Sequence, residues 1–373
     1  MNILFYTISE KRSRDIESQA IAFAKEGHSI FLFTQSGPSA LHDFFRSHKF
    51  KARYSKPVKT IFPLYVVIEM AKLVWISYRY RIDVIHAHLD PCCLIAVQAQ
   101  IFLRAKVIVT RHHADALQYE ASPKYQQISR NIYAKAKTIV AVSQNVKQFM
   151  VQHEGIDADK ITVVPLAYYF DLYEKPNAVT ITALKNLYKA QLLFCTVGRL
   201  TGLKRIDRII EFIDKLLKEG IDCKLIIVGQ GPEEEKLKRQ VVDLGLDDRI
   251  FFTGFSDNVL TYIAAAHYYL HFSVSEATCT VVKEAALVGT PVVVCEHVGD
   301  FDHYIQHKQN GYKVSKTDPV TSAIMLFQEI HNQEHERLVV GARLTDTVLS
   351  FFSIERVMPQ YKVLHDKVVN VAL

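Results

Sequence analysis

The sequence predicts an α/β protein built from two Rossmann-like domains. The chain has 373 residues, of which 49% are hydrophobic, and this is enough for two cores. Strand-like apolar runs alternate with helical runs, stop at a polar segment over 171–190, and start again at Leu192. We therefore expect a first domain over 1–170, a linker over 171–190, a second domain over 191–352 and a C-terminal segment over 353–373.

The first half opens with a β-α-β pattern. Residues 2–7 predict a strand, 14–26 a helix with one apolar face, and 28–34 a second strand. Further strands are expected at 84–87, 106–110, 138–142 and 160–165. The loop after the first strand lacks the glycine-rich fingerprint of a dinucleotide site, which argues against an NAD enzyme.

Several polar residues follow the predicted strands of the first half, where a parallel sheet forms its ligand crevice. They are His86, His88, Asp90, His112, His113, Asp115 and Ser143. His86, His88 and Asp90 suggest a metal site, but no second His/Cys cluster completes it. We therefore expect no metal, and a packing role for His86 and His88.

The second half repeats the alternation and adds polar loops at strand ends. Strands are expected at 192–197, 224–228, 249–253, 268–272, 292–295 and 311–314. The loop GRLTGLKR follows the first of these strands and the turn GQGP follows the second. Arg199 and Lys204 are five positions apart across the first loop, so both can converge on one diphosphate.

Residues 273–291 carry two glutamates, Glu276 and Glu284, eight positions apart. Thr278 or Thr280 could cap a helix that ends before Gly289, and its free N–H groups would suit a phosphate. Glu284, one turn in, could then reach a sugar hydroxyl. The plain alternative is an ordinary helix with solvated glutamates.

The positive charge is concentrated in the first half. The net charge is +6, and residues 1–170 hold 22 Lys and Arg against 13 Asp and Glu. Its densest part precedes the apolar stretch 61–78 and consists of Arg46, Lys49, Lys51, Arg53, Lys56 and Lys59. This pattern suits an anionic membrane surface, or a solvated loop beside a core helix. Nucleic acid is not expected, because no recognition motif accompanies the charge.

The six cysteines are scattered, which is typical of reduced thiols in a cytosolic protein. The N-terminus has no signal-peptide pattern, and no uncharged apolar run reaches 18 residues. We expect a cytoplasmic protein that can associate peripherally with the inner face of a membrane.

The order VGRL, VGQGPEEEKL, FTGF and SVSEATCTVVKEAALVGTPVV resembles the retaining glycosyltransferases of family 4, which have the GT-B fold. The segments KEGHSI, DVIHAH, VTRHH, VVPLAYYFD and FFSIERVMPQY extend the resemblance over nearly the whole chain. It implies two Rossmann-like domains facing a central cleft, with the acceptor on the first and the nucleotide-sugar on the second. It also implies that a helix in 353–373 crosses back to the first domain.

The resemblance assigns roles to individual residues. Arg199 and Lys204 would hold the diphosphate of the nucleotide-sugar, and Glu276 would contact hydroxyls of the donor sugar. Glu284 would bind the ribose. The loop glycines and the helix start would complete the donor site, and these residues are Gly198, Gly231, Thr280 and Val281.

The resemblance also implies that His112 contacts the sugar from the first domain, with His113 as the alternative. No metal or cofactor is expected, and the co-substrate would be a UDP- or GDP-sugar. Transfer would retain the anomeric configuration, toward a glycan or lipid-linked acceptor in bacterial polysaccharide or lipopolysaccharide synthesis.

One departure from the family keeps two other functions open. After the first glutamate the family usually has Gly-Phe-Gly-Leu-Pro, whereas this chain has Ala-Thr-Cys-Thr-Val. A GT-B sugar-nucleotide 2-epimerase would convert the donor without an acceptor. A non-catalytic binding protein would bind a nucleotide-sugar without turnover.

Overall fold

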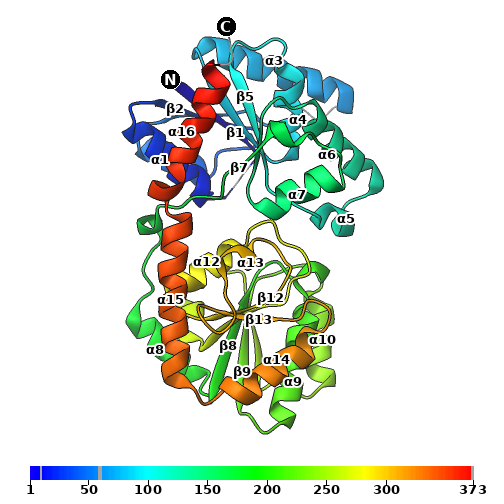
Figure 1. The fold of residues 1–373 in the computed structure, drawn as a ribbon, viewed down its shortest axis with the longest axis vertical. Helices are drawn as coiled ribbons and strands as arrows, with labels where there is room; N and C mark the ends of the chain where they lie inside the picture. The colour runs from blue at the N-terminus through cyan, green and yellow to red at the C-terminus, as the bar shows by residue number, and fades with distance from the viewer. Residues whose placement is uncertain (9–10, 58–60, 371–373) are drawn as a thin grey trace. The chain divides into compact units, whose positions relative to one another are not determined.

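The computed structural model describes residues 1–8, 11–57 and 61–370. The chain divides into two compact units, one of residues Met1–Leu172 and Phe352–Leu373, the other of Tyr173–Phe351. Each unit has a parallel sheet with helices (Figure 1). The predicted α/β class with two Rossmann-like units is confirmed.

The described part of the first unit is organised around a seven-stranded sheet in the order β3-β2-β1-β4-β5-β6-β7. All of its neighbouring strands pair in parallel. The strands are β1 Asn2–Thr7, β2 Ser29–Thr34, β3 Lys51–Tyr54, β4 Val84–His88, β5 Lys106–Arg111, β6 Ile139–Ala141 and β7 Ile161–Val163. The order reverses between β1 and β4, and open α/β sheets bind ligands at such a switch point.

The helices of the first unit alternate with its strands. They are α1 Arg14–Lys25, α2 Ala40–Ser47, α3 Phe62–Arg79, α4 Asp90–Ala99, α5 Ala116–Glu120, α6 Pro123–Lys135, α7 Gln144–Gln152 and α16 Ile354–Asn370. The last helix, α16, contacts α1 (Figure 1). Its Ile354, Val357 and Tyr361 join the core formed with β1 and β2. The C-terminal helix thus completes the core of the N-terminal unit.

The edge strand β3 was not predicted from the sequence. Its residues Lys51–Tyr54 are mostly exposed and lack the apolar alternation that marks a strand. They pair with β2 in a register from Phe31↔Lys51 to Thr34↔Tyr54. Lysine and arginine on such a strand are typical of edges that are protected from further pairing.

The second unit repeats the same strand order. Its six-stranded sheet runs β10-β9-β8-β11-β12-β13, with all neighbouring pairs parallel. The strands are β8 Leu192–Val197, β9 Cys223–Val228, β10 Ile250–Gly254, β11 Tyr268–His271, β12 Val292–Cys295 and β13 Tyr312–Val314. The switch point of this sheet therefore lies between β8 and β11.

The helices of the second unit include one in the segment that was expected to be a linker. The set is α8 Ala178–Leu187, α9 Ile206–Lys218, α10 Glu234–Asp243, α11 Val259–Ala265, α12 Thr280–Leu287, α13 Phe301–Tyr304, α14 Pro319–Ile330 and α15 Glu334–Phe352. Helix α8 lies in the expected linker over 171–190. Asn177 caps it by accepting from the N–H of Val179 at 2.8 Å, and α8 contacts α11. Half of the expected linker is therefore a helix that contacts α11.

Among the described residues, no helix combines the length and the apolar character that crossing a membrane requires.

Candidate active site

The loop after β8 carries three of the predicted site residues. Gly198 and Arg199 follow the strand directly, and the Arg199 side chain is exposed. Lys204 closes a 3-10 turn, Gly202–Lys204. Its Cε lies 3.8 Å from the point that a Cβ on Gly198 would occupy, so the lysine side chain returns over the end of β8. Lys204 is thus placed at the switch point of the second sheet.

Gly231, in the turn after β9, packs tightly against the backbone of this loop. A Cβ on Gly231 would lie 2.3 Å from the Leu200 carbonyl oxygen, and one on Gly229 would lie 1.9 Å from the Gly198 carbonyl oxygen. The N–H of Leu200 donates to the Gln230 carbonyl at 3.0 Å. These glycines therefore allow the two loops to pack together, and this supports the position of Lys204. A donor contact by Gly231 stays a prediction.

Glu276 follows β11, the strand next to β8, and contacts Lys204 from 72 positions along the chain. Its Oε1 accepts a hydrogen bond from Lys204 Nζ and lies 2.8 Å from His271 Nε2. Gly299, with φ +59°, makes the approach possible, because a Cβ there would lie 2.8 Å from that of Glu276. The predicted lysine and glutamate therefore meet at one oxygen.

His271 is a site residue that sequence reasoning missed. It is 4% exposed at the end of β11, and its Nδ1 lies 3.3 Å from the Tyr269 hydroxyl. Burial alone would lower the pKa of His271, but Cys279 and Glu276 outweigh it and raise that pKa to about 9. A histidine inside the apolar run YYLHF, five positions before Glu276, was the only available signal.

The carboxyl group of Glu276 is held ionised by the same contacts. Burial alone would raise the pKa of Glu276, but His271 and then Lys204 lower it to about 2. Two cationic groups therefore share one carboxylate, whose side chain is 11% exposed. Such a carboxylate is a fixed acceptor for hydroxyl groups at neutral pH.

Helix α12 begins at Thr280, so its N-cap is the residue between the two threonines that we expected to cap it, Thr278 and Thr280. Cys279 is at the N-cap, so both predicted caps are wrong. The Thr278 hydroxyl instead donates to Asp300 Oδ2 at 2.8 Å, and Lys283 Nζ contacts the same oxygen at 2.8 Å. Lys283 is 1% exposed, so a buried ion pair anchors the loop that differs from the family pattern.

The other predicted donor residues lie on this helix. Thr280 and Val281 form its first turn, and Glu284 lies one turn further on; all three are half-buried. The backbone N–H groups at the start of a helix suit an anion. Their contacts with a donor stay predictions.

Arg205 is bound to backbone carbonyl groups and does not join the cluster as an additional cation. Its Nε donates to the Phe272 carbonyl at 2.8 Å and its Nη1 to the Lys316 carbonyl at 2.9 Å. The guanidinium thus ties the start of α9 to two neighbouring segments. Its φ of +47° places it in the left-handed region, which favours glycine.

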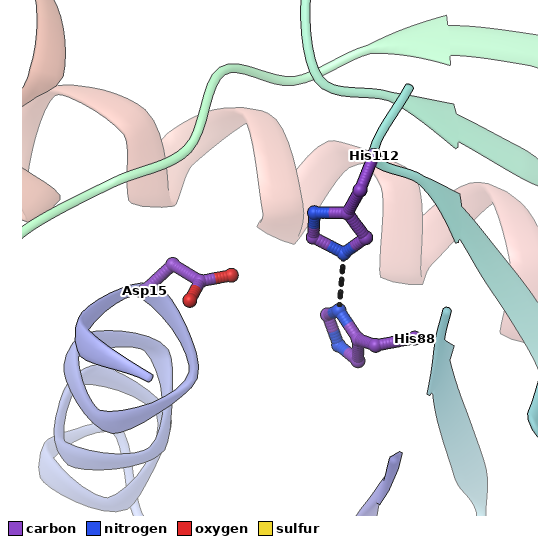
Figure 2. A group of neighbouring side chains, drawn as sticks. All are labelled: Asp15, His88 and His112. Carbon is purple, nitrogen blue, oxygen red and sulfur yellow. Dashed lines mark hydrogen bonds between the residues drawn. The ribbon is translucent and has the colours of Figure 1, made fainter. Parts of the chain in front are cut away.

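His112, the predicted contact from the first unit, lies directly after β5. Its Nε2 is 3.0 Å from Nδ1 of His88, the last residue of β4. Asp15, in the first turn of α1, points its carboxylate toward the two rings (Figure 2). Burial, and then the neighbouring imidazole, holds the pKa of His88 below its usual range. Burial also lowers the pKa of His112, so both rings are neutral at physiological pH.

The other histidines of the crevice have structural partners. His113 Nε2 lies 3.2 Å from Asp90 Oδ1, which also accepts from the Tyr133 hydroxyl at 2.8 Å. Burial alone would raise the pKa of Asp90, but His113 holds it well below its usual range. His86 is buried in the core, as expected, 2.8 Å from His365 of α16.

Two family models match the chain. Residues 181–340 match "Glycosyl transferases group 1", and residues 14–168 match "Glycosyltransferase Family 4". Among similar sequences, the N-acetyl-alpha-D-glucosaminyl L-malate synthase of Bacillus anthracis is 24% identical over 348 residues, covering 92% of this chain and 90% of its own. The alpha-monoglucosyldiacylglycerol synthase of Streptococcus pneumoniae is 23% identical over 301 residues, covering 72% of this chain and 64% of its own.

Among solved structures, the Anabaena protein HepE in complex with UDP-glucose is similar. It has a TM-score of 0.82 and 19% identity, with coverage of 98% of this chain and 100% of HepE. The fold and the matched models define a glycosyltransferase with the GT-B fold. Within that class the chain belongs to the family 4-like glycosyltransferases.

Proposed function

We propose that this enzyme is a retaining glycosyltransferase that uses a nucleotide-sugar and needs no metal ion for transfer. The observation that carries the proposal is the Lys204–Glu276–His271 cluster between the ends of β8 and β11. It combines a cation for a diphosphate with an ionised acceptor for sugar hydroxyls. The names of similar proteins support the donor class, since HepE was crystallised with UDP-glucose.

The roles follow from charge and position. Lys204 and the exposed Arg199 bind the diphosphate and stabilise the charge that develops on it as the glycosidic bond breaks. The N–H groups of Thr280 and Val281 bind phosphate oxygens at the positive end of α12. Glu276 accepts hydrogen bonds from donor-sugar hydroxyls. These groups provide positive charge from the chain itself, which is why we propose transfer without a metal.

The remaining roles concern the ribose and the reacting carbon. Glu284, one turn into α12, binds the ribose hydroxyls, and His112 contacts the sugar from the first unit. In a same-face reaction the departing phosphate oxygen takes the proton of the acceptor hydroxyl while the new bond forms, so the anomeric configuration is retained. No protein nucleophile is then required.

A donor screen tests this site. Thermal unfolding is measured with UDP-, GDP-, ADP- and CMP-sugars for the wild type, Lys204→Ala and Glu284→Ala. Exposed residues of the same unit give matched controls, Lys218→Ala and Glu235→Ala, whose side chains are 69% and 82% exposed. We expect one donor class to raise the unfolding temperature in wild type and controls only. Equal stabilisation of the two site variants would overturn the assignment.

Product analysis with the best donor separates the proposed transfer from the two alternatives. Retained stereochemistry at the anomeric carbon, in buffer with a chelator, is the expected result. Conversion of the donor without an acceptor would favour an epimerase. Binding without turnover across glycan and lipid acceptors would favour a non-catalytic protein.

We also propose that the first unit docks on an anionic membrane surface to reach a lipid-linked acceptor. Helix α3 buries Glu69 and Leu73 but exposes a second apolar face, with Val67 61% and Trp75 63% exposed. Further exposed apolar residues lie near it, namely Ile61, Phe62, Leu64, Ile101 and Phe102. A soluble surface rarely exposes so many large apolar groups together. The glycolipid product named for the Streptococcus pneumoniae relative supports a lipid acceptor.

The basic residues of β3 and its neighbours provide the charge for this docking. Lys51 and Arg53 lie on the exposed edge strand, and Lys56 follows it; Lys59 lies outside the described residues. In flotation with anionic liposomes at low salt, we expect the wild type to float with the liposomes and a smaller fraction of Trp75→Ala to do so. Met325→Ala, an equally exposed apolar residue of the second unit, is the control. No flotation of the wild type would overturn the membrane role.

A further inference from the structure

Asp15, His88 and His112 form a compact cluster from three different elements of the first unit (Figure 2). Asp15 lies in the first turn of α1, which follows β1, while His88 ends β4 and His112 follows β5. One carboxylate oxygen and one ring nitrogen from each histidine all lie within 4.8 Å of one another. The cluster lies at the switch point of the first sheet, where α/β folds bind ligands.

We propose that Asp15, His88 and His112 bind a divalent transition-metal ion such as Zn²⁺. Two imidazole nitrogens and one carboxylate oxygen are ligands that suit zinc and cobalt, whereas magnesium and calcium favour all-oxygen sites. Three protein ligands leave a fourth tetrahedral position for water or another small ligand. The three ligands belong to the first unit, and none of them is part of the Lys204–Glu276–His271 cluster of the second unit.

The two histidines require only small movements to bind a metal ion. Tetrahedral bonds of about 2.0–2.1 Å place zinc ligands roughly 3.3 Å apart. The two ring nitrogens are now 3.0 Å apart, so the rings need to separate by a few tenths of an ångström. The Asp15 carboxylate, which accepts from the Ser13 hydroxyl at 2.6 Å, approaches by side-chain rotation. That hydroxyl then orients the ligating carboxylate from the outer shell.

The burial of the cluster is a second argument for a ligand. Asp15 is 8% exposed and His88 is 1% exposed, and burying such polar groups is costly without full pairing. The two ring nitrogens that face each other, His88 Nδ1 and His112 Nε2, are the ones that a metal would bind. Ligation through these atoms and the Asp15 carboxylate would compensate for the burial of Asp15 and His88.

Metal binding has a consequence for transfer, and this consequence rests on the proposed function. A metal bound to His112 occupies the imidazole that, in our proposal, contacts the donor sugar. Zn²⁺ is therefore expected to inhibit transfer, and a chelator to restore it. Metal binding itself does not depend on the identity of the substrate.

The site is tested by direct titration with Co²⁺, whose visible absorption reports tetrahedral nitrogen and oxygen ligands. We expect one Co²⁺ per chain, displaced by Zn²⁺. Asp15→Asn and His88→Gln are expected to weaken binding at least about 10-fold, and His153→Gln, an exposed histidine of the same unit, to leave it unchanged. Thermal unfolding checks that each variant is folded. If His88→Gln does not fold, the test rests on Asp15→Asn, which keeps the shape of the side chain.

Absence of the absorption band in the wild type would overturn the proposal, and so would equal affinity in Asp15→Asn. Transfer assays then separate this proposal from the proposed function. If Co²⁺ binds as expected but transfer requires the metal, the proposal of a metal site is supported and the proposal of metal-independent transfer is wrong. If Zn²⁺ binds and transfer is unchanged, the metal site stands and the role of His112 fails.

Discussion

Each unit of this protein buries a histidine at 2.8 Å from a titratable partner, yet the two rings have opposite charge states. In the first unit, His365 is 2% exposed and lies 2.8 Å from His86. In the second, His271 is 4% exposed and lies 2.8 Å from Glu276. Burial lowers the pKa of His365 to about 4, helped by His28 and the N-terminal amine. The pKa of His271 is raised to about 9.

The difference shows that the partner, and not burial, decides the charge of a buried imidazole. Burial opposes the charged form in both rings. At His365 no neighbouring group compensates for burial, whereas at His271 Cys279 and Glu276 together reverse the direction of the pKa shift. The first unit therefore keeps neutral rings near its switch point, suited to a metal or a neutral contact. The second keeps a network of charges, suited to a diphosphate and hydroxyl groups.

Removing a cation from the charged cluster should have the largest effect. Lys204→Ala is expected to lower kcat/KM by roughly 100- to 1000-fold, because it removes positive charge from the leaving diphosphate and removes the lysine that binds Glu276. Steady-state transfer with the best donor measures this, with Lys218→Ala as the control. A loss of only a few-fold would mean that the diphosphate binds elsewhere.

Converting the second-unit histidine to an uncharged ring should have a smaller effect. His271→Phe removes the group that holds Glu276 Oε1 at 2.8 Å, and we expect a fall in kcat/KM of roughly 10- to 100-fold. The pKa of Glu276 should also rise, so activity should disappear at a higher pH on the acid side. The pH profile of kcat/KM measures both.

The matched variant of the first unit is His365→Phe. Its partner is His86 and its stacking neighbour is Phe23, so it should leave the donor site and the acid side of the profile unchanged. An identical pH profile for His271→Phe and wild type would show that His271 does not control the ionisation of Glu276.

The order of strands and loops could be predicted because it depends on local patterns. Buried parallel strands give continuous apolar runs, and the polar loops after 197 and 228 interrupt them. Since the ends of neighbouring strands meet at one edge of a sheet, the sequence predicted that Lys204 and Glu276 lie in one site. Both residues do meet, 72 positions apart.

The remaining features depend on long-range contacts that a local pattern does not contain. His86 and His365 are 279 positions apart, and neither carries a signal for the other. His271 is indistinguishable in the sequence from a core position of a strand. The packing of Gly231 against Leu200, and the use of Arg205 on two carbonyls, follow from the folded backbone. The edge strand β3 has no apolar face to mark it.

The smallest expected effect is on stability, and its sign differs between the units. For His365 the folded pKa lies below the usual 6.5, so the unfolded chain takes up the proton first and stability falls as pH drops from 6.5 toward 4. For His271 the folded pKa lies above 6.5, so its contribution is complete below 6.5 and is lost as pH rises toward 9. Each kcal/mol corresponds to roughly 2–4 °C in a domain of this size.

Thermal unfolding between pH 4 and 9 therefore separates the two rings. His365→Phe should reduce the dependence of the unfolding temperature on pH on the acid side, and His271→Phe should reduce it on the alkaline side. Each change should be a few degrees, at about 2–4 °C per kcal/mol. Because the groups beside His365 are His86, His28 and the N-terminal amine, its acid side should also be steeper at low salt. If both variants changed the same side of the curve, burial would outweigh the partner, and the contrast between the two units would fail.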